Sequence, residues 1–422
     1  MLDIKFIREN PEKVKEACKN KNVDCDVNNL LELDKKRKEL MQAVEDMKAK
    51  KNKATEQIQN AKEQKEKDVI ILKMRELDNN SDRVVNDFQE IDKEFQSLML
   101  KIPNIPFDDV PVGKDDSGNI VLREVGGKTK FDFTPVNYLE ISEKMDLIDI
   151  ERAGKVVGTR FGYLKGELAI LEFSLVNLVF DTIVKEGFVP VVPPVMLKAE
   201  MARGMGYLEQ TDEEEAYFLP KDNLYLVGTA EQSVGVMYAN EILDEKDLPK
   251  RYVAFSTCFR RESGAYGKDT KGILRVHQFD KIEMFSFCKP EKSNEEHEFF
   301  LSLEERLMQL LGIPYHVLRI CTGDLGRPAA KKYDVEAWMP GQNQYRETHS
   351  TSNCTDYQAR RLNMKYRDQK TGKPEFLHTV NGTAFAIGRT LIAIIENYQQ
   401  KDGSIKVPEV LQKYVSFKEI KR

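Results

Sequence analysis

Two long stretches of this chain place apolar residues at alternating intervals of four and three, which is the spacing of a coiled-coil seam. The first seam runs from Leu33 to Ala61 and the second from Ile70 to Ile102, and neither stretch contains Gly or Pro. At a rise of 1.5 Å per residue, each helix would extend about 40 to 60 Å, which is too long for a globular domain. The polar segment KEQKEKD lies between them and suits a reversal of the chain. We therefore predict a long antiparallel helical hairpin, with imperfect seam positions at Arg37, Lys51 and Ser81.

The two helices of this hairpin differ in charge. Residues 34–67 carry 11 Lys/Arg against 7 Asp/Glu, whereas residues 68–101 carry 5 against 8. One interpretation is electrostatic pairing between the helices, and the other is that the basic helix contacts the phosphates of an RNA. Because the net charge of the whole chain is −5, any nucleic-acid surface must be a local patch. Composition alone favours the pairing.

The pattern of residues changes after the hairpin. Pro103, Pro106 and Pro111 cannot continue a helix, so the run IPNIPFDDVPVG reads as a linker. Helical segments then alternate with β-rich runs such as FVPVVPPVML, RYVAFSTCF and IEMFSF. This mixture predicts an α+β domain built on an antiparallel sheet.

Cysteine usage and hydropathy indicate where such a protein resides. The six cysteines are scattered, without a CxxC pair or a Cys/His cluster at zinc spacing, so we expect reduced thiols in a cytoplasmic protein and no zinc. The opening MLDIKFIREN is charged and does not resemble a signal peptide. The most apolar stretch, residues 168–180, contains Glu172 and falls short of the roughly 20 residues that a membrane span needs. We expect a soluble protein without a membrane partner.

Residues 167–186 form a predicted helix that is apolar on nearly every side. Gly187 is the expected C-cap, and a strand follows that closes with Pro193 and Pro194. A helix of this kind must be covered all round. Either the monomer core or a subunit interface would do so.

Phosphate-binding chemistry is concentrated in the run CFRRESGAYGKDTKGILRVHQFDKIEMFSF. Arg260 and Glu262 end one β-rich run, and Arg275, Phe279 and Glu283 lie on the next. A loop with glycines and lysines, among them Gly264 and Lys268, joins them. Guanidinium groups bind phosphate in a fixed fork and an aromatic face stacks on a base, so two strands with a basic loop predict a nucleotide platform.

Two further segments near the C-terminus carry polar residues. In YRETHSTSN, Glu347 and Ser350 could share a Mg²⁺ ion, which prefers oxygen ligands and substrate phosphates. In TVNGTAFAIGRTL, we expect Gly382 and Gly388 to let a helix pack close to the sheet while Arg389 reaches a phosphate. A lone glycine spacing of this kind would be weak evidence.

Taken together and in order, these segments resemble the three motifs of class II aminoacyl-tRNA synthetases. Motif 1 corresponds to about 167–196, motif 2 to about 255–287 and motif 3 to about 381–398. Within the class, Thr229-Ala230-Glu231, EMFSF, the late NGT and the N-terminal hairpin resemble the seryl-tRNA synthetases. The resemblance covers essentially the whole chain. It implies a tRNA-binding helical hairpin over residues 1–109 and a class II catalytic domain over residues 110–422.

The resemblance also implies a role for individual residues, in an ATP-dependent, Mg²⁺-assisted ligation of L-serine to tRNA(Ser), with tRNA(Sec) as a possible further substrate. The catalytic residues would be Arg260, Glu283 and Arg389. Serine would be bound by Thr229, Ala230, Glu231, Arg260, Glu283, Asn381 and Thr383, without a fixed division between its ammonium and hydroxyl. ATP would be bound by Arg260, Arg261, Glu262, Val276, Phe279, Glu347, Thr348, His349, Ser350 and Arg389, with Glu347 and Ser350 holding Mg²⁺. The hairpin would bind the long variable arm of the tRNA, and the motif 1 helix would form a homodimer.

Three positions depart from the family pattern: His349 in place of a serine, Ala384 in place of a glycine, and the pair Arg327-Pro328 in a stretch that is often small and apolar. Three other functions each conflict with a feature of this sequence. A ligase that loads an amino acid onto a carrier protein would lack the hairpin. A non-catalytic RNA-binding paralogue would have lost residues such as Arg260 or Arg389. A synthetase for threonine would need a zinc site of Cys and His.

Overall fold

The computed structural model describes residues 1–208, 215–263, 267, 269 and 271–422, and of residues 64, 66 and 75–80 it describes the backbone only. The chain forms two compact units, Leu2–Pro103 and Asn104–Arg422, and Met1 belongs to the second. Among the described residues, no helix combines the length and the apolar character that crossing a membrane requires.

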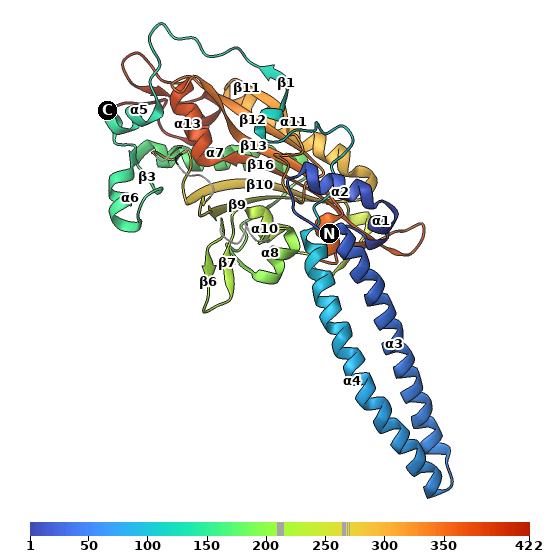
Figure 1. Cartoon of the computed structure of the whole chain (residues 1–422). Coiled ribbons are helices and arrows are strands. Elements are labelled where there is room, and N and C mark those ends of the chain that lie inside the picture. Colours follow the sequence, from blue (N-terminus) through green and yellow to red (C-terminus); the bar gives the residue numbers. More distant parts are fainter. Residues whose placement is uncertain (209–214, 264–266, 268, 270) are drawn as a thin grey trace. The chain divides into compact units, whose positions relative to one another are not determined.

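The N-terminal unit is made of four helices. They are α1 (Ile4–Glu9), α2 (Pro11–Asn20), α3 (Val27–Asn60) and α4 (Gln64–Lys101). The two long helices run antiparallel and side by side (Figure 1), as the sequence predicted. Asp26 caps α3, where its carboxylate accepts from the Asn29 amide at 2.9 Å. The connection between α3 and α4 is shorter than expected, because α4 already begins at Gln64 within the polar segment.

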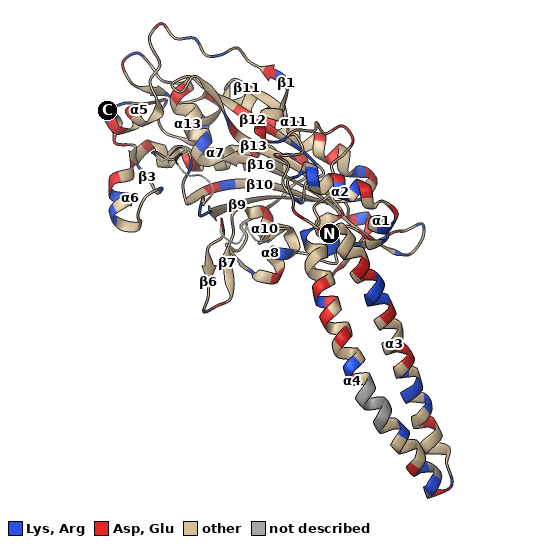
Figure 2. Ribbon diagram, in the orientation of Figure 1, with Lys and Arg blue, Asp and Glu red and all other residues tan. Residues whose placement is uncertain are grey.

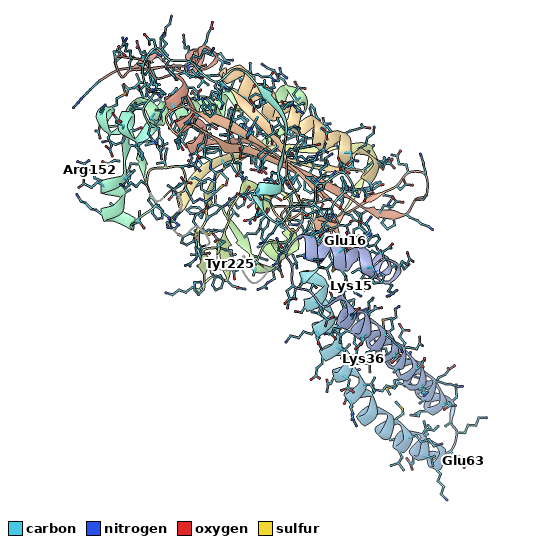
Figure 3. All side chains as sticks on the ribbon, turned by 45° about the horizontal axis from the view of Figure 1, so that its top comes forward. Lys15, Glu16, Lys36, Glu63, Arg152 and Tyr225 are labelled. Atoms are coloured by element: carbon cyan, nitrogen blue, oxygen red, sulfur yellow. The ribbon has the colours of Figure 1, made fainter. Side chains whose placement is uncertain are left out.

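The predicted seam is confirmed along α3. Every seam position from Arg37 to Ala61 is at least partly buried, whereas the flanking Lys36, Lys48 and Glu63 are exposed (Figure 3 labels Lys36 and Glu63). The imperfect step at Arg37 has a physical explanation. Its guanidinium forms an ion pair with Asp92 of α4 and lies 4.9 Å from the centre of the Phe95 ring. Residues of both charges recur along both helices (Figure 2).

The C-terminal unit is organised around one large sheet. Its strand order is β1-β11-β12-β13-β16-β10-β9-β4, antiparallel throughout except that β4 runs parallel to β9. The strands are β1 (Ile120–Val125), β4 (Val189–Val191), β9 (Lys250–Phe259), β10 (Gln278–Cys288), β11 (Tyr315–Arg319), β12 (Lys331–Met339), β13 (Gln344–Thr355) and β16 (His378–Ala386). This is the α+β, antiparallel-sheet fold that the β-rich runs predicted.

Three long helices pack on this sheet and share its main hydrophobic core: α7 (Gly166–Ile183), α11 (Ser293–Leu311) and α13 (Ile387–Asn397) (Figure 1). The helix α7 ends at Ile183, earlier than predicted, and Gly187 instead caps the 3-10 turn Val184–Glu186 that follows it, with a left-handed φ of 85° that suits glycine. Along β10, Ile282 and Met284 belong to this core. Because side chains alternate along a strand, their neighbours Lys281 and Glu283 face the other side of the sheet.

Smaller elements complete the unit. Within the described part of this unit, the remaining helices are α5 (Tyr138–Met145), α6 (Ile150–Val157), α8 (Ala199–Met205), α10 (Ala230–Val234) and α12 (Tyr357–Arg361). Short 3-10 turns lie at Asp116–Gly118, Val184–Glu186, Glu245–Asp247, Pro290–Lys292 and Glu409–Tyr414. Short strands form small separate sheets. In two-stranded sheets, β2 (Ile148–Asp149) pairs with β3 (Tyr163–Leu164), and β17 (Ile405–Lys406) pairs with β18 (Glu419–Ile420). In three-stranded sheets, β7 (Leu224–Leu226) lies between β5 (Met196–Lys198) and β6 (Phe218–Leu219), and β14 (Lys365–Arg367) lies between β8 (Ile242–Asp244) and β15 (Pro374–Phe376).

Candidate active site

A cavity of about 610 Å³ lies over the face of the sheet that the long helices leave open, and it gathers most of the expected site residues. Those that line it are Thr229, Glu231, Arg260, Glu262, Val276, Phe279, Glu283, Glu347, Thr348, Ser350, Asn381, Thr383 and Arg389. They span more than 150 residues of sequence and lie just after β9, just before β10, on β10, β13 and β16, and at the starts of α10 and α13.

Arg260 follows directly after β9 and is held by two neighbours. Its Nε donates to the Gly228 carbonyl oxygen at 3.1 Å, and its guanidinium lies 5.3 Å from the centre of the Phe279 ring. Arg260 and Phe279 both line the cavity. A fixed cation beside an aromatic ring suits an anionic group attached to a planar base.

Glu262 and Arg275 form an ion pair on the cavity wall, with Arg275 Nη1 donating to Glu262 Oε2 at 2.7 Å. Val276, the next residue, also lines the cavity. Gly264 and Lys268 of the expected basic loop lie outside the described residues.

A second charged group lies around Glu347 on β13. Arg389 Nη1 donates to the Glu347 carbonyl oxygen at 2.9 Å and to its Oε2 at 3.2 Å. Burial by itself would raise the pKa of Glu347, but the positive charges of Arg389, Lys332 and Arg260 outweigh it and lower that pKa to about 2. Glu347 is therefore an anion at neutral pH.

The spacing of Glu347 and Ser350 would ordinarily place them on opposite faces of a strand. The register of β12 and β13 shifts between Val335 and Glu336, so that Glu336 pairs with Glu347 and Val335 with His349. Thr348 is the extra residue of this bulge. Both Glu347 and Ser350 consequently line the cavity.

These two oxygen ligands fit a magnesium ion. A hard cation accepts an ionised carboxylate and a hydroxyl as its protein ligands, and fills its other positions with phosphate oxygens and water. Within the described part of the chain, no group of three or more His, Cys, Asp and Glu side chains is arranged to hold a metal. Glu347 and Ser350 would thus bind Mg²⁺ together with a phosphate, not alone.

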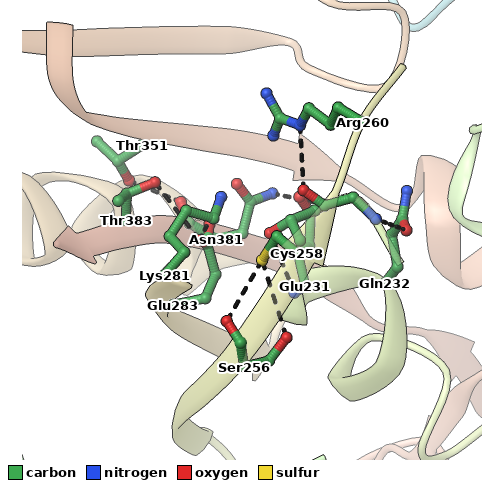
Figure 4. Close-up of polar contacts among 12 residues, drawn as sticks. Glu231, Gln232, Ser256, Cys258, Arg260, Lys281, Glu283, Thr351, Asn381 and Thr383 are labelled. Atoms are coloured by element: carbon green, nitrogen blue, oxygen red, sulfur yellow. Dashed lines mark hydrogen bonds and ion pairs between the residues drawn. The ribbon is translucent and has the colours of Figure 1, made fainter. Parts of the chain in front are cut away.

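The third part of the cavity is small, buried and acidic (Figure 4). Glu231 and Glu283 are both at least 95% buried. Lys281 lies on the same face of β10 as Glu283, and their charged groups are 2.6 Å apart. Thr383 Oγ1 donates to Glu283 Oε2 at 3.4 Å. Burial, and after it the negative charge of Glu283, raises the pKa of Glu231.

The structure places three expected site residues away from the cavity lining. Ala230 is fully buried in α10, next to Thr229, whose hydroxyl caps that helix by accepting from the Glu231 amide at 3.3 Å. Arg261 turns outward, where its Nε donates to the Ala216 carbonyl oxygen at 3.0 Å. His349 faces the core, with Nδ1 2.8 Å from Thr348 Oγ1 and its ring against Phe385, and burial lowers its pKa to about 3.

The structure also locates the other residues that depart from the family pattern. Ala384 is buried in the main core and does not line the cavity. Arg327 and Pro328 form part of the cavity wall, and Asn104 fixes this segment by donating to the Pro328 carbonyl oxygen at 2.8 Å. The expected close approach holds at Gly382, where a Cβ would lie 2.9 Å from Glu304 Oε1. It does not hold at Gly388, where a Cβ would lie 3.5 Å from the Ile273 carbonyl oxygen, an ordinary contact distance.

Several cavity residues were missed by the sequence reasoning. Lys281 had a signal, since it lies two residues before Glu283 and a strand places both on one face. Lys332 and Tyr207 also line the cavity. They come from a distant strand and from a loop, and nothing in their local sequence connects them to the motifs.

Comparison with known proteins connects this site with one family. Residues 1–106 match the family model of the seryl-tRNA synthetase N-terminal domain, and residues 217–398 match that of the class II tRNA synthetase core domain (G, H, P, S and T). A serine–tRNA ligase from Dictyoglomus thermophilum is 46% identical over 100% of this chain and 99% of its own length.

Two solved structures are similar over 100% of this chain and 99% of their own. The seryl-tRNA synthetase from Pyrococcus horikoshii complexed with ATP has a TM-score of 0.91 at 41% identity. The cytoplasmic serine–tRNA ligase from Naegleria fowleri in complex with AMP has a TM-score of 0.87 at 35% identity.

Proposed function

This chain belongs to the seryl-tRNA synthetase family, and on that premise we propose that its cavity activates serine with ATP and passes it to the 3′ end of tRNA(Ser). The observation that carries the proposal is one cavity that combines the Arg260, Arg389 and Glu347 group with a buried acidic pocket. The first suits a nucleotide triphosphate and the second suits a small amino acid. The carrier-protein alternative is not favoured, because residues 1–106 match the tRNA synthetase N-terminal domain.

Activation is an in-line displacement at the α-phosphorus. A carboxylate oxygen of serine forms the new bond, and pyrophosphate leaves with the electrons of the broken P–O bond. Arg260 neutralises charge on the α-phosphate and the serine carboxylate, and Arg389 does so on the outer phosphates. Phe279 stacks on adenine. A Mg²⁺ ion held by Glu347 and Ser350 would supply charge neutralisation at the phosphates. A hydroxyl of the terminal tRNA ribose then attacks the serine carbonyl carbon, and AMP leaves.

The charges of the acidic pocket indicate which of its carboxylates binds the ammonium group of serine and which binds the hydroxyl group. Glu283 is already neutralised by Lys281 at 2.6 Å, whereas the partners of the Glu231 carboxylate are neutral donors. The substrate ammonium therefore prefers Glu231. The hydroxyl is left for Glu283 and Thr383, which already share a hydrogen bond at 3.4 Å that it can join.

The N-terminal unit has the features of an RNA grip. Its α3 helix presents exposed lysines along a long arm, among them Lys48, Lys50 and Lys53. Such a surface binds phosphates without reading bases. We assign to it the long variable arm of tRNA(Ser).

The proposal is tested by ATP–pyrophosphate exchange across the amino acids. Serine should drive exchange, and alanine, glycine and threonine hardly at all. A pocket built to bind a hydroxyl disfavours a substrate that lacks one by about 10⁴- to 10⁵-fold, because its own buried groups then go unpaired. Exchange with any of the other three at a rate comparable to serine would contradict the pocket assignment.

A further inference from the structure

Gln358 lies at the start of α12 and is fully buried. It does not line the cavity, yet its side chain ends at the acidic pocket. Its Nε2 donates to Glu231 Oε1 at 3.1 Å and to the Met205 carbonyl oxygen at 3.2 Å. Its Oε1 accepts from the Thr379 hydroxyl at 2.6 Å. All the hydrogen-bonding capacity of the amide nitrogen is therefore used, and the amide joins α8, α10 and β16.

The Thr379 hydroxyl fixes the orientation of this amide. If the Gln358 side chain turned over, its nitrogen would face Thr379, and its oxygen would face the carboxylate of Glu231 and the carbonyl of Met205. Both of those are acceptors, so the turned amide would be repelled. Thr379 is itself fully buried and stands on β16, two residues before Asn381.

Among the residues that the structure describes, three neutral donors hold the Glu231 carboxylate. Besides Gln358, Asn381 Nδ2 donates to Oε1 at 3.1 Å and Tyr207 Oη donates to Oε2 at 2.9 Å. A carboxylate has roughly four lone-pair positions, so these donors leave one for a substrate. Tyr207 and Asn381 line the cavity and would touch a bound amino acid, whereas Gln358 acts only from behind.

We propose that Gln358 is a positioning residue for the amino-acid substrate: by donating to Glu231 Oε1 it fixes the carboxylate that receives the serine ammonium. This inference rests on the proposed function and deepens it at the same site. Gln358 touches neither the nucleotide end of the cavity nor the hydroxyl end at Glu283. Replacing Gln358 should therefore weaken the binding of serine without a comparable change in the binding of ATP.

Gln358 also affects the charge of Glu231. Burial raises the pKa of this carboxyl, and the Gln358 donation opposes that rise. Only the ionised carboxylate attracts an ammonium group. Without Gln358 the pKa rises further, and a larger share of Glu231 is neutral at a given pH.

The test is steady-state ATP–pyrophosphate exchange by the full-length Gln358→Met variant, in which an unbranched apolar side chain of similar length replaces the amide. A hydrogen bond to a charged group accounts for roughly 10- to 100-fold in binding, so KM for serine should rise by about that factor. KM for ATP should change less than about twofold, and the acid limb of kcat/KM for serine should move to higher pH.

Two controls separate positioning from a merely structural role. Gln399→Met removes another buried amide, one whose contacts are with Val136 and the Glu396 carbonyl, and should leave KM for serine unchanged. Thr379→Val, which frees the Gln358 amide, should raise KM for serine, and Thr379→Ser, which keeps the hydroxyl, should restore it. The valine and serine variants give the result even if Gln358→Met folds poorly.

The outcomes are distinguishable. Wild-type KM for serine and an unshifted acid limb in both Gln358→Met and Thr379→Val would overturn the inference while leaving the proposed function intact. An equal rise in KM for ATP and serine would also overturn it, since the role would then be structural. A wild-type enzyme without serine-dependent exchange would instead overturn the proposed function and, with it, this inference.

Discussion

At the scale of single residues, Glu304 is a buried acid that the reaction does not use. It lies on α11, fully buried beneath Gly382, and among the described residues neither carboxyl oxygen has a hydrogen-bond partner. Burial, and then the negative charges of Glu283 and Asp334, raises its pKa well above the usual value. The folded protein therefore holds a proton here at pH values where the unfolded chain has released it.

This proton makes stability depend on pH in a defined direction. Above the unfolded pKa of about 4.3, the folded state binds more protons than the unfolded state, so stability falls as pH rises, by up to about 1.4 kcal/mol per pH unit until the folded pKa is passed. Glu304→Gln removes the titration. We expect the thermal midpoint of the variant, relative to wild type in the same buffers, to improve between pH 6 and pH 8. Parallel midpoints across that range would contradict the assignment.

The site residues whose proximity could be predicted from the sequence are those that belong to a local pattern. Arg260 lies at the end of β9, and Phe279 and Glu283 lie on β10, the strand paired with it, so their spacing brings them together. Glu347 and Ser350 needed the bulge at Thr348, and a bulge of this kind leaves no mark in composition. The same bulge sends His349 into the core although its neighbours face the cavity. Gln358 of α12 and Tyr207 of the loop after α8 reach Glu231 from distant parts of the sequence and could be found only in the folded chain.

At the scale of elements, the seam spacing was sufficient to predict α3 and α4, because a coiled coil is specified by local periodicity. The boundary of the tip was less certain, since polar residues continue a helix as readily as they form a turn. The structure also shows which part of the arm can be altered. Leu30, Leu33, Phe95 and Met99 are buried at its base, so a deletion that reached them would expose the core of the N-terminal unit.

Charge reversal is therefore the sharper test of RNA binding by the arm. The triple variant Lys48→Glu, Lys50→Glu and Lys53→Glu changes exposed positions only. Because each lost phosphate contact removes counterion release, we expect kcat/KM for tRNA(Ser) to fall at least about tenfold and its salt dependence to weaken. Serine-dependent exchange, which needs no tRNA, should stay within about twofold.

The matched control for this variant reverses three exposed lysines of the C-terminal unit, Lys144, Lys155 and Lys401, which are 66%, 69% and 72% exposed. It should charge tRNA normally. If both triple variants lost charging equally, long-range charge would explain the effect. If neither did, the arm would not be the grip.

At the scale of the whole molecule, an apolar surface of the C-terminal unit has no cover within the described chain. On α7, Ile170 and Phe173 are 48% and 62% exposed, one helical turn apart. Val189 of β4 and Val192 just after it are 53% and 80% exposed. The helix is thus apolar on both sides, as the sequence indicated, and the monomer core covers only one of them. Large apolar side chains exposed on a helix that is apolar on both sides mark an interface.

We propose that a second copy of the chain covers this surface, and Phe173→Glu tests the proposal. Burying an aromatic side chain contributes roughly 1.5 to 3 kcal/mol, and each copy of a symmetric dimer would contribute the same residue, so a charge there is introduced twice against an apolar partner. Sedimentation should show a dimer for wild type and monomers for the variant. Val157→Glu, at a position 58% exposed on α6, should remain dimeric. A wild-type monomer at micromolar concentration would refute the homodimer, and a dimeric Phe173→Glu would move the interface elsewhere.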